Sequence, residues 1–248
     1  MKTIILAAGK GKRLGELTRT IPKPMLKIRT KPILEHNIEW LKDYGIRDIY
    51  INLHHSPGAI KSYFKNGKKW GVNIQYSYEP KLLGTAGAVR KIVEDFWIKG
   101  SWDEEKYNPC PTLNNPFLVL YGDNLFEYDL REIINFHERK KGIATIAVYE
   151  RDNVNQSGIV LLNDENRIIK FTEKPKPDEI VSHLVNTGLY ILEPEVLDYI
   201  PSNKVLDFGK DVFPKMIQKD ENIFGVIFKG NLTAVDTPFL YKKITGDN

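Results

Sequence analysis

Cysteine is almost absent from this sequence, because Cys110 is the single thiol among 248 residues. One thiol excludes an intramolecular disulfide and any metal site built from several cysteines. No apolar run approaches the roughly 20 residues that a membrane-spanning helix needs. The apolar start of the chain is also too short, and too soon interrupted by basic residues, for a signal peptide. These absences lead us to expect a soluble cytoplasmic protein without a membrane partner.

An excess of one charge is missing as well. The 36 Lys and Arg residues face 32 Asp and Glu residues, which leaves a formal net charge of +4. Many nucleic-acid-binding proteins are far more basic, and they interleave basic with stacking aromatic residues. Neither feature is evident here, so we do not expect nucleic acid as a partner. Small anionic ligands stay open.

The order of apolar runs predicts an α/β fold. Short apolar or β-branched runs occupy residues 2–8, 48–53, 72–79 and 117–122, with room for helices between them. The segment 32–45 has apolar residues at helical spacing, with Pro32 at the expected first helical position and Gly45 at its end. Crossovers of this kind imply a parallel sheet.

The second half of the chain adds closely spaced strands. After the segment 129–142, strands are expected at 143–150, 158–164 and 167–173, joined by turn-like segments. We therefore expect one Rossmann-like domain, residues 1–248, with a mixed, mostly parallel central sheet. Residues 97–116 show no period, and we interpret them as an inserted loop. A last helix is expected at 237–245.

The segment "AAGKGKR", residues 7–13, follows the first apolar run and combines two glycines with three basic residues. At the carboxyl end of a parallel strand, such glycines let backbone N–H groups approach an anion. A dinucleotide fingerprint would need a glycine at Leu14, and the Gly-Lys-Ser/Thr ending of a Walker motif is absent. The segment indicates a phosphate loop of another type, with a solvated Gly-rich turn as the alternative.

Lys23 follows between two prolines, which restrict its backbone. The whole run "ILAAGKGKRLGELTRTIPKPMLKI" resembles the signature of the sugar-1-phosphate nucleotidylyltransferases, which join a nucleoside triphosphate to a sugar 1-phosphate. Further motifs follow in that family's order: "YEPKLLGTAGAV", "VLYGDNLF", "FTEKP", "VNTGLYIL" and "DFGKDVFP". The chain is similar to compact members that act on mannose, heptose or related sugar phosphates, without a β-helix or cupin-like extension.

The resemblance implies the nucleotide-diphospho-sugar transferase type of fold and an Mg²⁺-dependent displacement at the α-phosphorus, with pyrophosphate leaving. It assigns catalysis to Arg13, Lys23 and Asp123, and the metal to Asp123 and Asp236. The implied nucleotide-binding residues are Ala8, Gly9, Gly11, Glu79, Gly84 and Thr85. The implied sugar-phosphate-binding residues are Gly158, Glu173, Lys174 and Asn186.

The chain departs from the family's pattern at several positions. Lys12 stands where a small residue is common, and Gly15 interrupts the usual proline neighbourhood. The family's second metal carboxylate belongs to a pattern like Asp-x-Gly-Thr-Pro, whereas "AVDTP" here has Ala234 first and Asp236 third. Asp236 would coordinate the metal from a shifted position, act through water, or only cap the last helix.

The choice of base depends on Glu79, whose carboxylate is able to accept two hydrogen bonds from guanine. This favours GTP, although members with Glu include uridylyltransferases. Three alternatives stay open: cytidylyl or uridylyl transfer to another sugar phosphate, transfer to a non-sugar phosphate, and a catalytically silent nucleotide-sugar-binding regulatory subunit. His54 and His55 are adjacent, point to opposite sides of an extended chain, and are expected to be structural. A homo-oligomer is compatible with the sequence.

Overall fold

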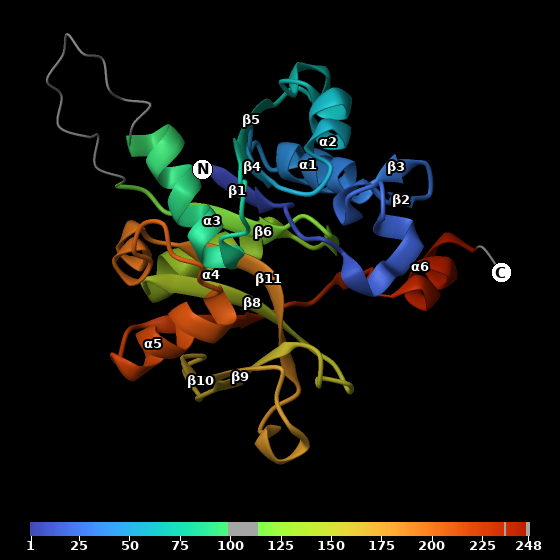
Figure 1. The fold of residues 1–248 in the computed structure, drawn as a ribbon. Helices are drawn as coiled ribbons and strands as arrows, with labels where there is room; N and C mark the ends of the chain where they lie inside the picture. The colour runs from blue at the N-terminus through green and yellow to red at the C-terminus, as the bar shows by residue number, and fades with distance from the viewer. Residues whose placement is uncertain (99–113, 236, 247–248) are drawn as a thin grey trace, which may run out of the picture. The chain divides into compact units, whose positions relative to one another are not determined.

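A computed structural model describes residues 1–98, 114–235 and 237–246 of the chain. The fold is α/β with a mixed, mostly parallel central sheet, as the sequence pattern predicts. The chain falls into two compact units, the first formed by residues 1–82, 120–127 and 231 onward, the second by residues 83–119 and 128–230. Figure 1 follows the elements along the chain. The expectation of one domain stays a prediction, and the expected inserted loop at 97–116 lies mostly outside the described residues.

Parallel strands form the centre of the first unit. β1 (Thr3–Leu6) pairs in parallel with β4 (Asp48–Leu53), and β4 pairs in parallel with β5 (Asn73–Tyr78). β6 (Phe117–Tyr121), whose last residues belong to this unit, neighbours β1. The helices α1 (Ile33–Asp43) and α2 (Pro57–Phe64) lie in the connections that follow β1 and β4. The predicted strands and the predicted parallel pairing are confirmed.

The helix α1 begins one residue later than the sequence predicts. Pro32 is its N-cap, with ψ at 147°, and belongs to a short antiparallel pair formed by β2 (Lys27–Ile28) and β3 (Lys31–Pro32). The proline is therefore used in a strand pair, where its fixed φ and missing N–H are tolerated. The helical spacing is right, because the apolar residues Ile33, Leu34, Ile38 and Leu41 are all fully buried.

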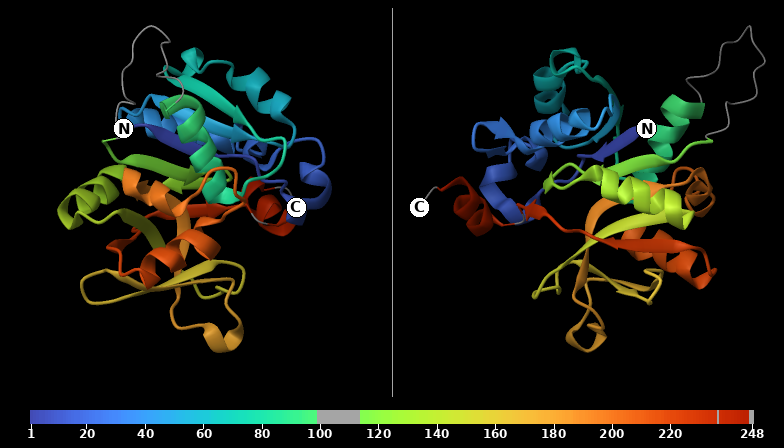
Figure 2. Two further views of the ribbon diagram at one scale, coloured as in Figure 1. Left: turned by 60° about the vertical axis from the view of Figure 1, so that its left-hand side comes forward. Right: turned by 180° about the vertical axis from the view of Figure 1, so that it is seen from behind.

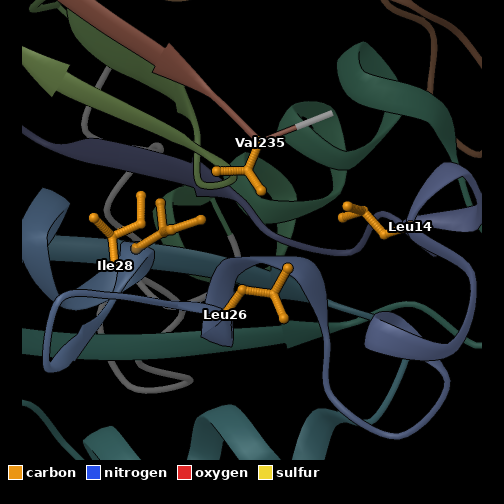
Figure 3. Packing of buried hydrophobic residues seen from close by; sticks show 5 residues of the cluster. Leu14, Leu26, Ile28 and Val235 are labelled. Atoms are coloured by element: carbon orange, nitrogen blue, oxygen red, sulfur yellow. The ribbon is translucent and has the colours of Figure 1, made fainter. Parts of the chain in front are cut away.

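Short elements complete the first unit. They are η1 (Lys12–Thr18), η2 (Lys23–Met25), η3 (Lys68–Trp70), β7 (Asn124–Glu127), β13 (Asn231–Ala234) and α6 (Pro238–Thr245). β13 pairs antiparallel with β7, which brings residues beyond 230 next to the segment that follows β6. A buried cluster joins η1, β2, α1 and the residue after β13, and partly buried residues of β7 and α6 pack against it; Figure 3 labels four of its members. The cluster consists of Leu14, Leu26, Ile28, Ile33 and Val235.

The second unit holds the antiparallel part of the sheet. β11 (Leu184–Leu192) pairs antiparallel with β8 (Ala144–Glu150) and with β9 (Gly158–Leu162), and β9 pairs with β10 (Ile168–Glu173). β12 (Ile223–Ile227) pairs in parallel with β8. The antiparallel strands expected in this half are confirmed. β11 and β12 lie outside the predicted strands. In β11, Asn186, Thr187 and Gly188 interrupt the apolar residues, so neither alternation nor a continuous apolar run marks the strand.

Helices cover the strands of the second unit. They are α3 (Gly84–Ile92), η4 (Val93–Ile98), α4 (Leu130–Lys140), η6 (Pro177–Glu179), η7 (Pro194–Tyr199), η8 (Phe208–Val212) and α5 (Phe213–Gln218). α4 packs against β8 and β12, and α5 packs against β10 (Figure 2). Asp129 caps α4 by accepting a hydrogen bond from Arg131 N–H. Among the helices of the described ranges, none is long and apolar enough to cross a bilayer.

Candidate functional site

Lys23 and Asp123 are separated by 100 residues, yet their side chains pair in the first unit. Lys23 Nζ donates to Asp123 Oδ2 at 2.7 Å. Lys23 lies in η2 directly after the N-cap residue Pro22, and Asp123 follows β6 at its carboxyl end. Lys23 is only 6% exposed, whereas the Asp123 side chain keeps 32% exposure. The pair therefore presents a partly hydrated carboxylate that already has a cation beside it.

The loop that follows β1 is held at its start by a side chain of β4. Ala7 N–H donates to Asn52 Oδ1 at 2.6 Å, and Asn52 Nδ2 donates to Glu79 Oε1 at 2.7 Å. Asn52 and Glu79 are 4% and 1% exposed, so both hydrogen bonds lie in the interior of the unit. Ala8 is buried as well. The sequence pattern does not point to Asn52, because this residue stands in an apolar strand, where its polar side chain near the end of the run is a weak signal.

Gly11 requires glycine for two reasons. Its φ is 59°, and a Cβ there would lie 2.9 Å from Thr18 Cγ2. Thr18 Oγ1 donates to Gly11 O at 2.9 Å, so the loop and the end of η1 hold each other. Gly9 differs, because no atom lies within 4 Å of the place where its Cβ would be. Gly9 and Arg13 are both exposed, which leaves this side of the loop accessible.

The adjacent histidines bond to different segments of the first unit. His54 Nδ1 lies 2.8 Å from Glu79 O, and His55 Nε2 lies 2.9 Å from Thr18 O. Two rings held by carbonyls of separate segments fit the structural role expected for them. They also connect the residues after β4 to the last residue of η1 and to the residue that follows β5.

In the second unit, the motif "GTAG" begins α3 and packs on the backbone before η8. Thr85 N and Oγ1 both lie 3.2 Å from Asp207 Oδ1, and Phe208 N–H donates to Thr85 Oγ1 at 2.9 Å. A Cβ at Gly84 would overlap Leu206 O. Asp207 therefore serves the start of α3 as a cap supplied from a distant segment. No local pattern could reveal it, because 122 residues separate Asp207 from Thr85.

Glu173 lies at the end of β10, directly across from Gly158 on β9. A Cβ at Gly158, or at Gly209 in η8, would lie 2.7 Å from Glu173 Oε2. Two glycines from different elements thus leave room for one carboxylate. The sequence analysis assigns Gly158 to the sugar-phosphate site and gives no role to Gly209, a lone glycine inside a helical segment.

The charge of Glu173 is influenced by burial and by its neighbours. Burial raises the pKa of Glu173, the positive charges of Lys174 and Lys210 oppose that rise, and Asp207 adds to it. Lys174 itself is exposed and has φ at 51°, a left-handed conformation that is uncommon for a residue with a side chain. Its N–H donates to Ser157 O at 3.0 Å. The left-handed backbone of Lys174 is therefore held directly after the half-buried Glu173.

Asn186 is placed by an irregularity in β11. The register of β11 against β8 shifts between Asn186 and Tyr190, and Asn186 Oδ1 accepts from Gly188 N–H at 2.9 Å. Asn186 Nδ2 donates to Tyr190 Oη at 2.8 Å. Gly188, at φ 78°, supplies the turn of the bulge. The motif "VNTG" therefore builds a bulge that holds the half-buried Asn186 side chain.

A metal at this site would depend chiefly on Asp123. The register of β13 places Ala234 opposite Asn124, the residue after Asp123, whereas Asp236 lies outside the described residues. No group of three or more His, Cys, Asp and Glu side chains in the described part of the chain is arranged to hold a metal ion. A single accessible carboxylate still fits Mg²⁺, which takes one or two carboxylates and completes its shell with phosphate and water.

Comparison with known proteins gives three kinds of similarity. The profile of the nucleotidyl transferase family matches residues 2–236. The chain is 40% identical over 237 residues to a UTP–glucose-1-phosphate uridylyltransferase of Synechocystis sp., covering 91% of this chain and 58% of that protein. It is 36% identical over 224 residues to a mannose-1-phosphate guanyltransferase of Saccharomyces cerevisiae, covering 89% of this chain and 57% of that protein.

A similar fold occurs in a crystal structure from Bacillus anthracis, of a protein named as a glucose-1-phosphate thymidylyltransferase and solved with a sucrose. It matches with a TM-score of 0.82 at 26% identity, and the match covers 99% of this chain and 94% of that chain. By contrast, the chain spans less than two thirds of the curated relatives named above, at 58% and 57% of their lengths.

Proposed function

Since the chain belongs to the nucleotidyl transferase family, we propose that it condenses a nucleoside triphosphate with a sugar 1-phosphate. An oxygen of the sugar phosphate forms a bond to the α-phosphorus, while the bond from that phosphorus to the oxygen bridging to the β-phosphate breaks. Pyrophosphate leaves with the electron pair, and nothing is oxidised or reduced. The observation that carries this proposal is the 40% and 36% identity to two proteins named as sugar-1-phosphate nucleotidyltransferases.

In this proposal the first unit binds the triphosphate. The backbone N–H groups of the loop with Ala8, Gly9 and Gly11 approach the phosphates, and Arg13 and Lys23 neutralise the charge that grows on the leaving pyrophosphate. The exposure of Gly9 and Arg13 supports this assignment. Catalysis of this kind needs alignment and charge neutralisation and no covalent bond to the protein.

Asp123 is the residue we propose to hold Mg²⁺, with Asp236 as a further candidate ligand. When bound, the ion would neutralise and orient phosphate oxygens of the nucleotide. The position of Asp123 at the carboxyl end of β6, with 32% of its side chain exposed, supports this role. Lys23 donates to the same carboxylate in the described structure, so it has to release Oδ2, or share Asp123, when the metal binds.

We assign the sugar phosphate to the second unit. Lys174 would contact the phosphate, while Glu173 and Asn186 would bind sugar hydroxyls beside Gly158. The left-handed backbone of Lys174 supports this assignment, because strained conformations are kept where a side chain must be aimed. The room that Gly158 leaves for the Glu173 carboxylate also supports it. Gly84 and Thr85, at the start of α3, are further residues that we propose to bind nucleotide.

For the nucleotide we propose GTP, read by Glu79. The yeast guanyltransferase supports this choice, whereas the Synechocystis uridylyltransferase favours UTP as the second candidate. Glu79 is 1% exposed, so the atoms that cover its carboxylate must move aside for a base to reach it. Glu79→Gln should weaken the preference for GTP with a smaller loss of maximal rate. An unchanged preference would contradict this assignment.

The proposed function is tested by pyrophosphate release in Mg²⁺, with each common nucleoside triphosphate and a panel of sugar 1-phosphates that includes mannose, glucose, N-acetylglucosamine and heptose. Release with one combination identifies the base and the sugar. Asp123→Ala serves as the inactive control. Silence of folded protein over the whole panel would favour a regulatory subunit that binds nucleotide sugars, and Ala234→Asp would then be the first variant to assay.

A further inference from the structure

The Asn52 side chain connects three segments of the first unit. It stands on β4, accepts from Ala7 N–H at the beginning of the first loop, and donates to Glu79 Oε1 just after β5. β1 ends at Leu6, so Ala7 is the first residue beyond the strand. The Asn52 side chain therefore binds the backbone at the residue where the strand pairing of β1 ends and the first loop begins.

The direction of these hydrogen bonds is determined by their partners. Ala7 N–H is a donor, so the Asn52 atom facing it must be the oxygen; a carboxylate only accepts, so the atom facing Glu79 must be the NH₂. With Asn52 4% exposed and Glu79 1% exposed, water cannot readily replace either partner. A change at one end of this chain of hydrogen bonds must therefore affect the other end.

We propose that Asn52 is a positioning residue that aligns the first loop with the carboxylate of Glu79. The proposal rests on the proposed function only for the identity of the ligands, which are the phosphates at the first loop and the base at Glu79. The alignment itself is a property of Ala7, Asn52 and Glu79. It makes the place of the loop depend on a side chain that we do not expect to touch substrate.

Asn52→Asp tests the donor in this arrangement. The new carboxylate can still accept from Ala7 N–H, but its second oxygen faces Glu79 Oε1 at the 2.7 Å now spanned by the amide. Two carboxylates at this distance share one proton at low pH and repel each other once both are ionised. The alignment should therefore hold better at pH 6 than at pH 8 in this variant.

A second change should repair the first. In the double variant Asn52→Asp with Glu79→Gln, the glutamine NH₂ donates to the aspartate, which still accepts from Ala7 N–H. The double variant has the total charge of the native pair with every donor facing an acceptor. If Asn52 and Glu79 acted independently, the second substitution would not restore the alignment that the first one disturbs. Recovery of alignment in the double variant, beyond its folding, therefore indicates that the two side chains act together.

A matched control exists at the other end of the same two strands. Asn73 Nδ2, on β5, donates to Asp48 Oδ1, on β4, at 3.1 Å, and both residues are exposed. Asn73→Asp makes the same chemical change in water, far along the strands from the loop. It should leave the loop as it is in the native protein at both pH values. His54, whose ring bonds to Glu79 O, is a titratable side chain beside Glu79 and is present in every variant.

Two readouts separate this proposal from the proposed function. The first is hydrogen exchange of the Ala7 amide, followed by NMR without any ligand. We expect it to be at least about tenfold faster than in the native protein for Asn52→Asp at pH 8. The acceleration should be smaller at pH 6, and in the double variant and in Asn73→Asp the rate should lie within about threefold of native.

The second readout is the affinity for pyrophosphate in Mg²⁺, which carries no base and so does not depend on recognition by Glu79. We expect the pyrophosphate affinity to fall most for Asn52→Asp at pH 8 and less for the same variant at pH 6. The double variant and Asn73→Asp should bind pyrophosphate as the native protein does. Native exchange at Ala7 in Asn52→Asp at pH 8, or a folded double variant that exchanges as fast as the single one, would overturn the proposal. If Asn52→Asp does not fold, a folded double variant with native exchange supports the alignment, and an unfolded double variant overturns it. Absence of pyrophosphate binding in the native protein would count against the proposed function alone.

Discussion

Lys23 and Asp123 differ in how much water reaches them, and this difference predicts unequal effects of mutation. Lys23 is 6% exposed and the Asp123 side chain 32% exposed. Asp123→Asn leaves a buried ammonium with a weaker acceptor, so we expect a loss of about 1–3 kcal/mol in the free energy of unfolding. Lys23→Met leaves a carboxylate that water can solvate, and the loss should stay below about 1 kcal/mol. Urea unfolding measures both, and a larger loss for Lys23→Met would contradict this account.

A second prediction concerns the half-buried carboxylate of Glu173, whose pKa is raised by burial. A raised folded-state pKa means that ionisation costs more in the folded than in the unfolded protein. The native protein therefore loses stability as pH rises from the ordinary range of a glutamate through the raised pKa. Glu173→Gln does not titrate, so its melting temperature relative to native should increase with pH over that interval.

Melting curves between pH 4 and pH 8 test this prediction. Glu138→Gln, at an exposed position of α4, is the control for removing a negative charge, and it should change the melting temperature little. The opposite trend, a relative gain for Glu173→Gln that grows as pH falls, would show that burial does not dominate the charge state of Glu173. The rate of pyrophosphate release by Glu173→Gln should also fall if the Glu173 carboxylate binds sugar hydroxyls.

Sequence alone could predict candidate residues of the site but not what holds them. Lys23 and Asp123 were both expected, because each lies in a motif of local residues. Asn52, Asp207 and Gly209 have no predicted role, because each acts on a segment distant in sequence. Asp207 and Gly209 lie in the motif "DFGKDVFP", but the motif does not reveal which segment they contact. A buried polar group must find a partner, yet the pattern does not say which segment supplies it.

At the scale of elements, the first loop contains two glycines that look equivalent in the sequence but have different surroundings in the structure. Gly11→Ala places a Cβ against Thr18 at φ 59°, so we expect a loss of about 1–2 kcal/mol in the free energy of unfolding. Gly9→Ala meets no atom within 4 Å and should change that free energy by less than about 0.5 kcal/mol. Chemical denaturation of both variants, without ligand, measures the difference. Equal losses would mean that the loop is not held by Thr18.

Elements whose signal is local were the ones that could be predicted. β1, β4, β5 and β6 are short apolar runs bounded by polar residues, and α1 has apolar positions at helical spacing. β11 lies outside the predicted strands, because Asn186, Thr187 and Gly188 interrupt its apolar residues and leave neither an alternating nor a continuous apolar pattern. The start of α1 was placed one residue early because Pro32 favours both a helix start and an extended N-cap.

For the whole molecule, we expect metal to be needed for catalysis and not for folding. Lys23 already donates to Asp123, so the carboxylate has a counter-charge before any ion binds. Removal of divalent metal with EDTA should abolish pyrophosphate release, and excess Mg²⁺ should restore it. The thermal melting curve should be the same in EDTA and in Mg²⁺ without nucleotide, to within about 2 °C. A large fall in melting temperature in EDTA would indicate a structural ion instead.

The measurement that tests the central claim most directly is ³¹P NMR of the reaction mixture with the best pair of nucleoside triphosphate and sugar 1-phosphate. We expect the signals of both substrates to decrease together, while those of a nucleoside diphosphate sugar and of pyrophosphate rise in equal amounts. The Asp123→Ala variant should leave the spectrum unchanged. Appearance of orthophosphate with a nucleoside diphosphate, or no change with folded native protein, would contradict nucleotidyl transfer to a sugar phosphate.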